Sequence, residues 1–279
     1  MSYKTVLAYL SGPESSQSVL GAALNLAEAH NAHVIGLHVL PNLAVYAGSG
    51  LQAYPEILTR QREEDKRRAE ETRQLFEELC SRTVVAYEWR CADAKWSNLE
   101  SVVSEHIRCA DLVVALRGGE SFLEAYDDLS TDIVLSSGRP VVLVSESGWQ
   151  DEIGSKVLVA WNGSREAARA AFDALPILKM AKQVYVLSIN PPKDDRENML
   201  STSDDIALAL ARHDVPVEAM TDVAPNIRVA DEILSRVSDL GCNLVVMGCY
   251  GHSRLRETVF GGVTREIMNS ATVPVLMSH

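Results

Sequence analysis

Cysteine is scarce in this chain, and its arrangement is not that of a disulfide framework or a zinc site. There are five cysteines, an odd number, and no CxxC pair. Cys242 and Cys249 flank a predicted strand, but His252 is the only nearby histidine that could join them as a metal ligand. We therefore expect buried free thiols and no metal site.

Positive charge is also in short supply. The chain has 26 Lys and Arg against 38 Asp and Glu, which gives a formal net charge of -12. Such a surface repels phosphate backbones at long range, so nucleic acid is not an expected partner. A nucleotide is compatible with this charge, because backbone N–H groups and a helix dipole can hold a phosphate without net positive charge.

The apolar run near the start is too short to be a signal peptide or to cross a bilayer. Residues 1–10, MSYKTVLAYL, contain one Lys and then a few apolar residues before the polar SGPESS. We interpret this run as a strand of a cytoplasmic protein without stable membrane insertion. Apolar residues make up 47% of the chain and charged residues 23%, the mixture of a globular protein with a full core.

The two halves of the sequence repeat one another. KTVLAYLSGPESS at 4–16 recurs in pattern as KVLVAWNGSREAA at 156–168, and HVIGLHVLPN at 33–42 is echoed by QVYVLSINPP at 183–192. ADLVVALRGG at 110–119 resembles CNLVVMGCYG at 242–251, and RPVVLVS at 139–145 resembles TVPVLMS at 272–278. We predict a tandem duplication, with domains at 1–149 and 150–279 joined through the polar segment 145–155.

Each half alternates short Val/Ile/Leu-rich runs with segments of helical periodicity. This pattern predicts two doubly wound α/β domains with parallel, Rossmann-like sheets. In the second half we place strands near 156–161, 183–189, 215–223, 243–248 and 273–277. A helix before the fourth of these is expected to bury one face, made of Ile227, Ala230, Ile233, Leu234 and Val237.

Two further expectations concern surfaces. Because each sheet alone would expose an edge, the two domains are expected to pack as a pseudo-dimer. The mixed-sign segment 59–79 predicts a solvated helix with one apolar seam, in preference to a partner-binding site.

The segment 245–268, VVMGCYGHSRLRETVFGGVTREIM, carries the clearest sign of a binding site. Gly248 and Gly251 follow a predicted strand, and Gly261 and Gly262 precede a predicted helix that begins near Val263. Glycines there let backbone N–H groups approach an anion, and the helix start adds its positive dipole end. Thr264 could offer a hydroxyl to a phosphate. The segment is neither a Walker loop nor a GxGxxG motif.

These residues resemble the universal stress protein family, whose ATP-binding members carry Gly, two residues, Gly, nine residues, Gly, then Ser or Thr. Gly248, Gly251 and Gly261 have this spacing. The resemblance extends over both halves: VAWNGS at 159–164 is similar to the family's opening strand with Asp-Gly-Ser, and VPVLMS at 273–278 to its closing strand. It implies the family's α/β fold and a site for ATP, with or without Mg²⁺.

Carried over by position, the resemblance assigns a nucleotide site in the second half. The family's acidic residue falls on Asn162, which has no charge, and the residue whose backbone meets adenine falls on Ile189. The family's Ser or Thr falls on Gly262, which keeps a backbone donor but has no hydroxyl. The implied site comprises Asn162, Ile189, Gly248, Gly251, His252, Gly261, Gly262, Val263 and Thr264.

The first half departs further from the family pattern. Leu10 or Ser11 takes the acidic position, and Leu116 stands where Gly248 would be. Asp127 and Asp128 replace Gly261 and Gly262, and their carboxylates would repel a triphosphate. With Asp132 they could hold a cation, but a solvated helix start is the better interpretation.

The resemblance favours a cytoplasmic stress-response protein that binds ATP or a related nucleotide and acts as a sensor or adaptor, with a protein partner or a homodimer possible. No catalytic residue is assigned. Three alternatives stay open. One is slow nucleotide hydrolysis, with His252 or Asp222 positioning water and Thr264 a metal-bound phosphate. The second is a non-nucleotide ligand, such as an apolar small molecule, in the first half. The third is a pure interaction scaffold.

Overall fold

The chain forms two compact units of similar build. The computed structural model describes residues 2–42, 55–95, 97–118, 129–146, 152–191, 202–249 and 262–279. One unit, here the N-terminal unit, comprises 3–137 and 146–150. The other, the C-terminal unit, comprises 138–145 and 151–279 together with the first two residues.

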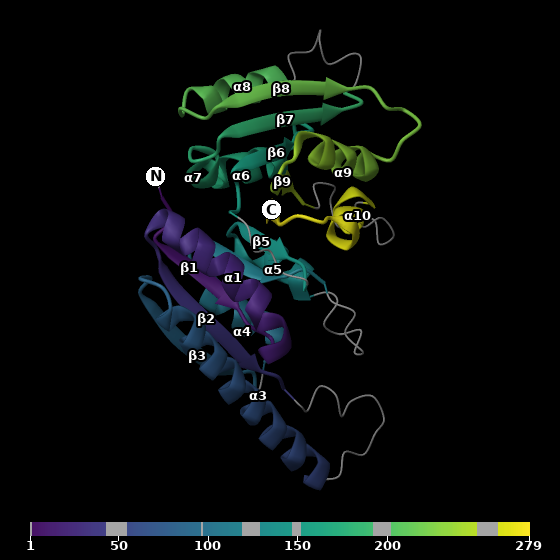
Figure 1. Cartoon of the computed structure of the whole chain (residues 1–279). Coiled ribbons are helices and arrows are strands. Elements are labelled where there is room, and N and C mark those ends of the chain that lie inside the picture. The colour runs from purple at the N-terminus through teal and green to yellow at the C-terminus, as the bar shows by residue number, and fades with distance from the viewer. Residues whose placement is uncertain are drawn as a thin grey trace. The chain divides into compact units, whose positions relative to one another are not determined.

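The N-terminal unit is a parallel sheet with helices on both faces (Figure 1). Its strand order is β3-β2-β1-β4, so the order reverses between β1 and β4. Helices α1 and α3 pack on each other, as do α4 and α5. The elements are β1 (Thr5–Tyr9), α1 (Pro13–His30), β2 (His33–Leu40), α3 (Pro55–Ser81), β3 (Tyr87–Asp93), α4 (Leu99–Ile107), β4 (Leu112–Leu116) and α5 (Leu129–Ser137).

Helix α3 confirms the predicted charged helix with one apolar seam. Ala69, Thr72, Phe76 and Cys80 are buried at helical spacing. Phe76 lies over Gly36 of β2, where an added Cβ would meet its ring at 2.6 Å, and its ring is 5.5 Å from that of Trp89. The opposite face carries ion pairs between residues three or four apart, such as Arg73 with Glu70 and Glu77.

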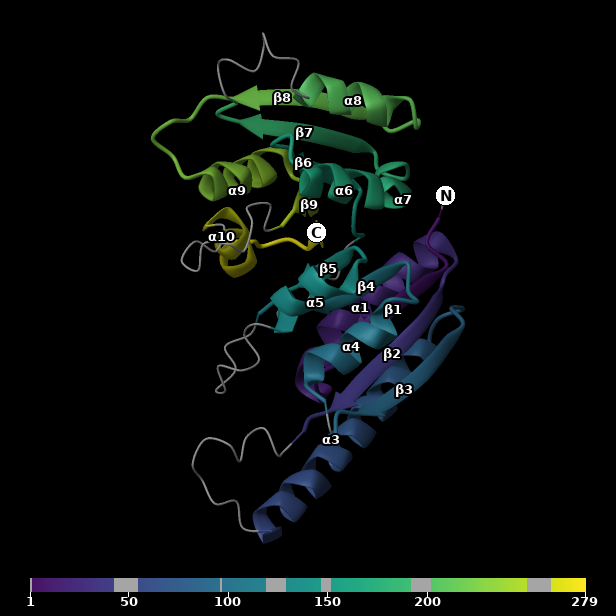
Figure 2. The ribbon, with the colours of Figure 1, turned by 180° about the vertical axis from the view of Figure 1, so that it is seen from behind.

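The C-terminal unit repeats this architecture, as Figure 2 shows from behind. Its strand order is β5-β10-β9-β6-β7-β8, with the reversal between β6 and β9. Helix α6 packs on β9 and β10, α8 on β7 and β8, and α9 on α10. The elements are β5 (Val141–Val144), β6 (Lys156–Ala160), α6 (Arg165–Asp173), α7 (Leu175–Leu178), β7 (Gln183–Ile189), α8 (Ser203–Ala211), β8 (Val217–Asp222), α9 (Val229–Leu240), β9 (Leu244–Gly248), α10 (Gly262–Ser270) and β10 (Val275–Ser278).

Strand β5 is an exception to the parallel pattern. It pairs antiparallel with β10, and Val142 lies opposite Leu276. Contacts therefore group this strand with the C-terminal unit, although the sequence repeat places it at the end of the first half. Both strands are fully buried, so their apolar runs show no alternation.

Several helix ends follow from local sequence. Ser164 caps α6 by accepting a hydrogen bond from the N–H of Ala167 at 3.1 Å. Thr202 and Asp205 form a capping box at the start of α8. Helix α9 ends at Gly241, whose φ of +63° is in the left-handed region that glycine favours.

Two sequence predictions need correction. Ile227 does not belong to the buried face of α9: the helix begins at Val229, and Ile227 is 49% exposed because it precedes the first turn. All five cysteines are free, but only Cys80, Cys242 and Cys249 are buried. Cys91 and Cys109 are exposed, because Cys91 lies on β3 at the edge of its sheet and Cys109 follows the end of α4.

In the parts of the chain that the structure describes, no helix combines the length and apolar character needed to cross a membrane.

Candidate functional site

The carboxyl ends of the C-terminal unit's strands bring together three of the predicted site residues. In the sheet register Ala160 of β6 lies opposite both Leu187 of β7 and Met247 of β9. Asn162, Ile189 and Gly248 therefore lie at the same edge, on either side of the point where the strand order reverses. Ligands of open α/β sheets bind in the crevice at such a point.

Helix α10 begins at this edge. The chain leaves β9 at its carboxyl end and returns through α10 to the amino end of β10, which is parallel to β9. The helix N-terminus, with its free N–H groups and positive dipole end, is therefore on the side of the strand ends. Gly262 and Val263 form its first residues, and Thr264 is buried. Gly251, His252 and Gly261 lie outside the described residues.

Asn162 forms a local turn just after the carboxyl end of β6. Its Oδ1 accepts a hydrogen bond from the N–H of Ser164 at 3.1 Å, and Gly163 between them has a φ of +73°. This Asx turn uses the amide oxygen. The side-chain NH₂ group, on an exposed residue, is left to donate to a ligand.

Gly248 has a packing role that the sequence did not indicate. A Cβ at this position would lie 2.3 Å from the carbonyl carbon of Glu166 and 2.4 Å from the nitrogen of Ala167. Both are backbone atoms in the first turn of α6, so no side chain can move aside to make room. Gly248 allows α6 to approach the end of β9 closely, whatever its part in ligand binding.

Gly262 differs from Gly248, because a Cβ at this position would meet no atom of the described residues within 4 Å. The space in front of the first turn of α10 would accept a Ser or Thr. Packing against the described residues therefore does not require glycine here, although the family's Ser or Thr, with its hydroxyl, is replaced.

Ile189 ends β7 and is partly exposed, and the residue after it holds the neighbouring strand end in place. Asn190, at a φ of +49°, accepts a hydrogen bond from the N–H of Ala224 at 2.7 Å and donates one to its carbonyl at 3.1 Å. Asp222, considered for hydrolysis, accepts a 2.7 Å hydrogen bond from Arg236 Nε. Its carboxylate is thus committed to an ion pair.

Cys249 lies next to this edge but is not a nucleophile. It is 1% exposed, and burial together with the nearby Glu166 carboxylate raises the pKa of its thiol to about 12. The thiol is therefore protonated at neutral pH. Among the described residues, no group of three or more His, Cys, Asp or Glu side chains is placed to hold a metal ion.

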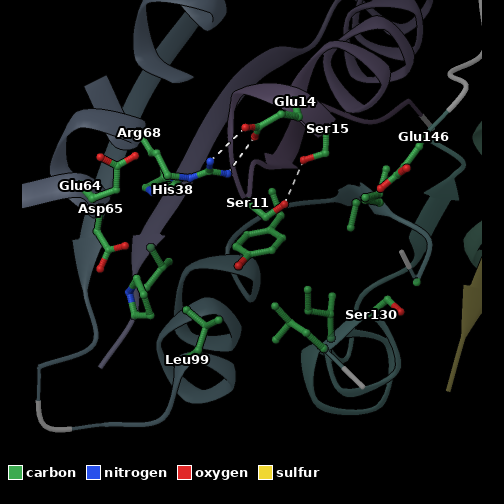
Figure 3. A pocket seen from close by; sticks show the side chains of 18 of the residues that line it. Ser11, Glu14, Ser15, His38, Glu64, Asp65, Arg68, Leu99, Ser130 and Glu146 are labelled. Carbon is green, nitrogen blue, oxygen red and sulfur yellow. Dashed lines mark hydrogen bonds and ion pairs between the residues drawn. The ribbon is translucent and has the colours of Figure 1, made fainter. Parts of the chain in front are cut away.

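The N-terminal unit has a cavity of about 740 Å³ at its own strand ends. Tyr9 of β1, Val39 of β2 and Leu116 of β4 line it, as do Leu129, Ser130 and Ile133 of α5. Figure 3 shows Ser130 and Glu146 on one side of the cavity and Glu64, Asp65 and Arg68 on the other. The cavity lies at the carboxyl ends of β1, β2 and β4, and the candidate site of the C-terminal unit lies at the carboxyl ends of the corresponding strands β6, β7 and β9. Asp127 and Asp128 lie outside the described residues, and Asp132 is in the first turn of α5.

The structure also decides which residue of the first half matches Asn162. The N–H of Leu10 donates to the carbonyl of Leu37, and the N–H of Trp161 donates in the same way to Leu187, both at 2.8 Å. Leu10 therefore corresponds to Trp161, and Ser11 to Asn162. Leu10 is fully buried, whereas the hydroxyl of Ser11 lies 3.0 Å from that of Ser15.

Sequence reasoning missed the contribution of α3 to this cavity. Gln61, Glu64, Asp65 and Arg68 all line it. Their spacing of three, four and seven residues places them on one face of the helix, which was a signal available in the sequence. It was overlooked because the charges of α3 were interpreted as a solvated face.

Comparisons with known proteins agree with this architecture. The model of the universal stress protein family matches residues 2–145 and again 155–279. A universal stress protein of Synechocystis sp. is 24% identical over 172 residues, which are 60% of this chain and 57% of that protein. The chain thus spans little more than half the length of that relative.

One solved structure has the same fold over nearly the whole chain. A universal stress protein from Archaeoglobus fulgidus aligns over 98% of this chain and 95% of its own, with a TM-score of 0.76 at 16% identity. A universal stress protein solved in complex with cAMP matches 45% of this chain and 96% of its own, with a TM-score of 0.37 at 17% identity. The two family matches cover nearly all of the sequence, and the chain therefore belongs to the universal stress protein family, as a tandem pair of its domains.

Proposed function

We propose that the C-terminal unit binds ATP or a related nucleotide, and that the chain acts in the cytoplasm as a stress-response sensor or adaptor. The base and ribose would lie along the ends of β6 and β7, near Asn162 and Ile189. The polyphosphate would lie at the amino end of α10, with Gly251, His252 and Gly261 contributing from the preceding segment. Mg²⁺ could bind together with the nucleotide, coordinated by the phosphate oxygens.

One observation carries this proposal. Asn162, Ile189 and Gly248 are far apart in sequence, yet the strand register brings them to the edge where the strand order reverses and where α10 begins. The family resemblance selected the same residues: Gly248 by the spacing of the glycines, and Asn162 and Ile189 by their positions after the first and second strands. An uncharged amide, a strand end and a helix N-terminus suit a nucleotide even on a chain with net charge -12.

Binding is favoured over hydrolysis by the chemistry of the described groups at this edge. The Asp222 carboxylate is held by Arg236, and the Cys249 thiol is protonated. A nucleotide that is bound and not consumed can report its own concentration through the protein. Signalling would then pass to a protein partner or a second copy of the chain.

The test uses Gly262, where any small side chain fits. Gly262→Asp introduces a carboxylate that suits the helix dipole but repels a polyphosphate. Gly262→Asn has nearly the same shape without the charge. By calorimetric titration with ATP and Mg²⁺, we expect wild type and Gly262→Asn to bind within a few-fold of each other, and Gly262→Asp to bind about tenfold more weakly.

Melting temperature serves as the control for folding, and neither variant should lower it. The proposal is wrong if millimolar ATP gives neither heat nor thermal stabilisation with the wild-type protein. It is equally wrong if ATP binds and the Asp and Asn variants have the same affinity, because the phosphates then lie elsewhere.

A further inference from the structure

The two halves of helix α3 are attached to the N-terminal unit in different ways. The buried side chains of its second half are Ala69, Thr72, Phe76 and Cys80. Among the described side chains of residues 56–68, in the first half, none is buried. Figures 1 and 2 show this half extending past the ends of β2 and β3. Burial of apolar surface therefore holds the second half in place but contributes little to the first.

The first half of α3 forms one wall of the cavity of the N-terminal unit. Its lining residues are Gln61, Glu64, Asp65 and Arg68, of which the last three lie together in Figure 3. We call residues 58–68 the wall segment. Helix α3 has no glycine or proline after Pro55, so it contains no hinge on which this segment could swing away as an intact helix. The wall segment can leave the cavity only by unwinding from its amino-terminal end.

Two arginines tie the wall segment to other elements. Arg62 donates from Nη1 to the carbonyl of Pro41, just after β2, at 3.2 Å and forms an ion pair with Asp93 at the end of β3. Arg68 donates to both carboxylate oxygens of Glu14, in the first turn of α1, at 2.9 Å and 2.8 Å. These last two hydrogen bonds hold the pKa of Glu14 below its ordinary value.

Both ion pairs are partly exposed to water. The side chains of Arg62 and Asp93 are 23% and 27% exposed, and those of Arg68 and Glu14 are 38% and 70% exposed. Ion pairs in such positions stabilise a fold only slightly, because water and salt screen them. The wall segment is therefore held closed by contacts that separate easily.

One buried group favours opening. Asp65 Oδ1 accepts a hydrogen bond from Gln61 at 3.1 Å, but Asp65 Oδ2 is buried and has no hydrogen-bond partner in the described part of the chain. Such a carboxylate oxygen has lost its water without a replacement. Unwinding of the wall segment returns this oxygen to water, so the closed state carries a cost that the open state does not.

We propose that the wall segment is a local unfolding unit, which opens the cavity while residues 69–81 and the sheet stay folded, and which the ion pairs of Arg62 and Arg68 hold closed. Such units come from parts of a protein with few buried apolar contacts. Opening removes the wall that α3 contributes, so the cavity of about 740 Å³ admits larger molecules than it does when closed. The inference does not depend on nucleotide binding by the C-terminal unit.

Amide hydrogen exchange of the full chain, resolved along α3 by NMR or mass spectrometry, tests this proposal. We expect amides of the wall segment to exchange at least about tenfold faster than those of residues 72–81. Arg62→Gln and Arg68→Gln should each accelerate exchange about two- to fivefold. The acceleration should extend over the whole wall segment in both variants, because the segment opens as one unit.

Arg73→Gln is the matched control on the same helix. Arg73 pairs with Glu70 and Glu77, both in the second half of α3, so these ion pairs are present whether the wall segment is open or closed. Exchange of the wall segment should not change in this variant. Asp65→Asn, in contrast, should slow it a few-fold, since a neutral amide costs less to bury than a carboxylate.

Exchange in the wall segment as slow as in residues 72–81 would overturn the proposal. So would exchange that Arg62→Gln and Arg68→Gln leave unchanged, or that Arg73→Gln accelerates equally, because ordinary fraying of a helix end then explains it. Equal acceleration of residues 72–81 would mean that the whole helix opens together and would also contradict the proposal. Exchange that is unchanged or faster in Asp65→Asn would do the same, because the buried carboxylate then does not favour opening.

Discussion

The two units share a framework but differ in what lies at the carboxyl ends of their strands. The hydrogen bonds from Leu10 to Leu37 and from Trp161 to Leu187 have the same place and the same length of 2.8 Å. The corresponding strands β9 and β4 end differently, however. Gly248, at the end of β9, lies against the first turn of α6, whereas Leu116, at the end of β4, lines a cavity. Duplication thus preserved the backbone pairing of the sheets while the side chains at the two edges diverged.

The difference has a physical origin in the helices that cover each sheet. In the N-terminal unit α3 is 27 residues long and reaches the strand ends with Glu64, Asp65 and Arg68. In the C-terminal unit the corresponding helix, α8, has nine residues. One long amphipathic helix therefore both closes the core of its unit and supplies the charged wall of the cavity.

The largest effect is expected from removing the core side chain by which α3 is held. Phe76→Ala should lower the free energy of unfolding by about 3 to 5 kcal/mol, because a fully buried ring leaves a void. Phe172→Ala, in α6 of the C-terminal unit, removes a ring that is 43% exposed and should cost about 1 kcal/mol or less. Urea unfolding of both variants gives the comparison, and equal losses would contradict it.

A smaller effect is expected at the glycine that distinguishes the two edges. Gly248→Ala should destabilise the C-terminal unit by about 1 to 3 kcal/mol, since the added methyl meets backbone that must shift. Leu116→Ala enlarges a cavity that already exists, and the methyl group of Gly262→Ala meets no described neighbour, so both should destabilise the protein less. Thermal melting of the three variants should rank Gly248→Ala lowest. If Gly248→Ala has the melting temperature of the wild-type protein, α6 can move away from β9 at little cost.

The smallest effect is a dependence of stability on pH in the N-terminal unit. His30 and His38 are buried, and burial lowers the pKa of each below the ordinary imidazole value of 6.5. The unfolded chain therefore takes up protons before the folded one, so stability is complete above about pH 6.5 and falls as the pH drops below it.

Replacing both residues with Asn tests this pH dependence. The double variant should lose less stability between neutral and mildly acid pH than the wild-type protein, as measured by urea unfolding. His213→Asn changes an exposed imidazole of the C-terminal unit and should leave the dependence as it is. If the free energy of unfolding of the double variant depends on pH as steeply as that of the wild-type protein, other groups cause the acid sensitivity.

Much of the fold could be predicted because its signals are local or repeated. The apolar runs predicted strands β6 to β10 of the second half to within two residues, and the repeats revealed the tandem architecture. Ile227 was assigned wrongly because periodicity alone does not mark where a helix begins. The antiparallel pairing of β5 with β10 was not predicted, since a buried strand has the same apolar composition in either orientation.

The candidate site was predictable only in part. Asn162, Ile189 and Gly262 were carried over by position from the family resemblance, but the close packing of Gly248 against α6 depends on residues more than eighty positions away. The cavity of the N-terminal unit was anticipated only in the alternative that the first half binds a non-nucleotide, apolar ligand. Its acidic wall comes from α3, whose charges could equally have faced water.

By itself, the sequence determined the duplicated α/β plan, the net negative charge and the glycine-rich segment before α10, because these depend on composition, period and spacing along the chain. Only the tertiary structure decided which charges face water and which face a cavity. It also decided that Ser11 and not Leu10 matches Asn162, and that Asp65 and Ser130 each have a buried oxygen with no hydrogen-bond partner in the described part of the chain. These outcomes depend on burial and on contacts between residues distant in the chain, which no local pattern records.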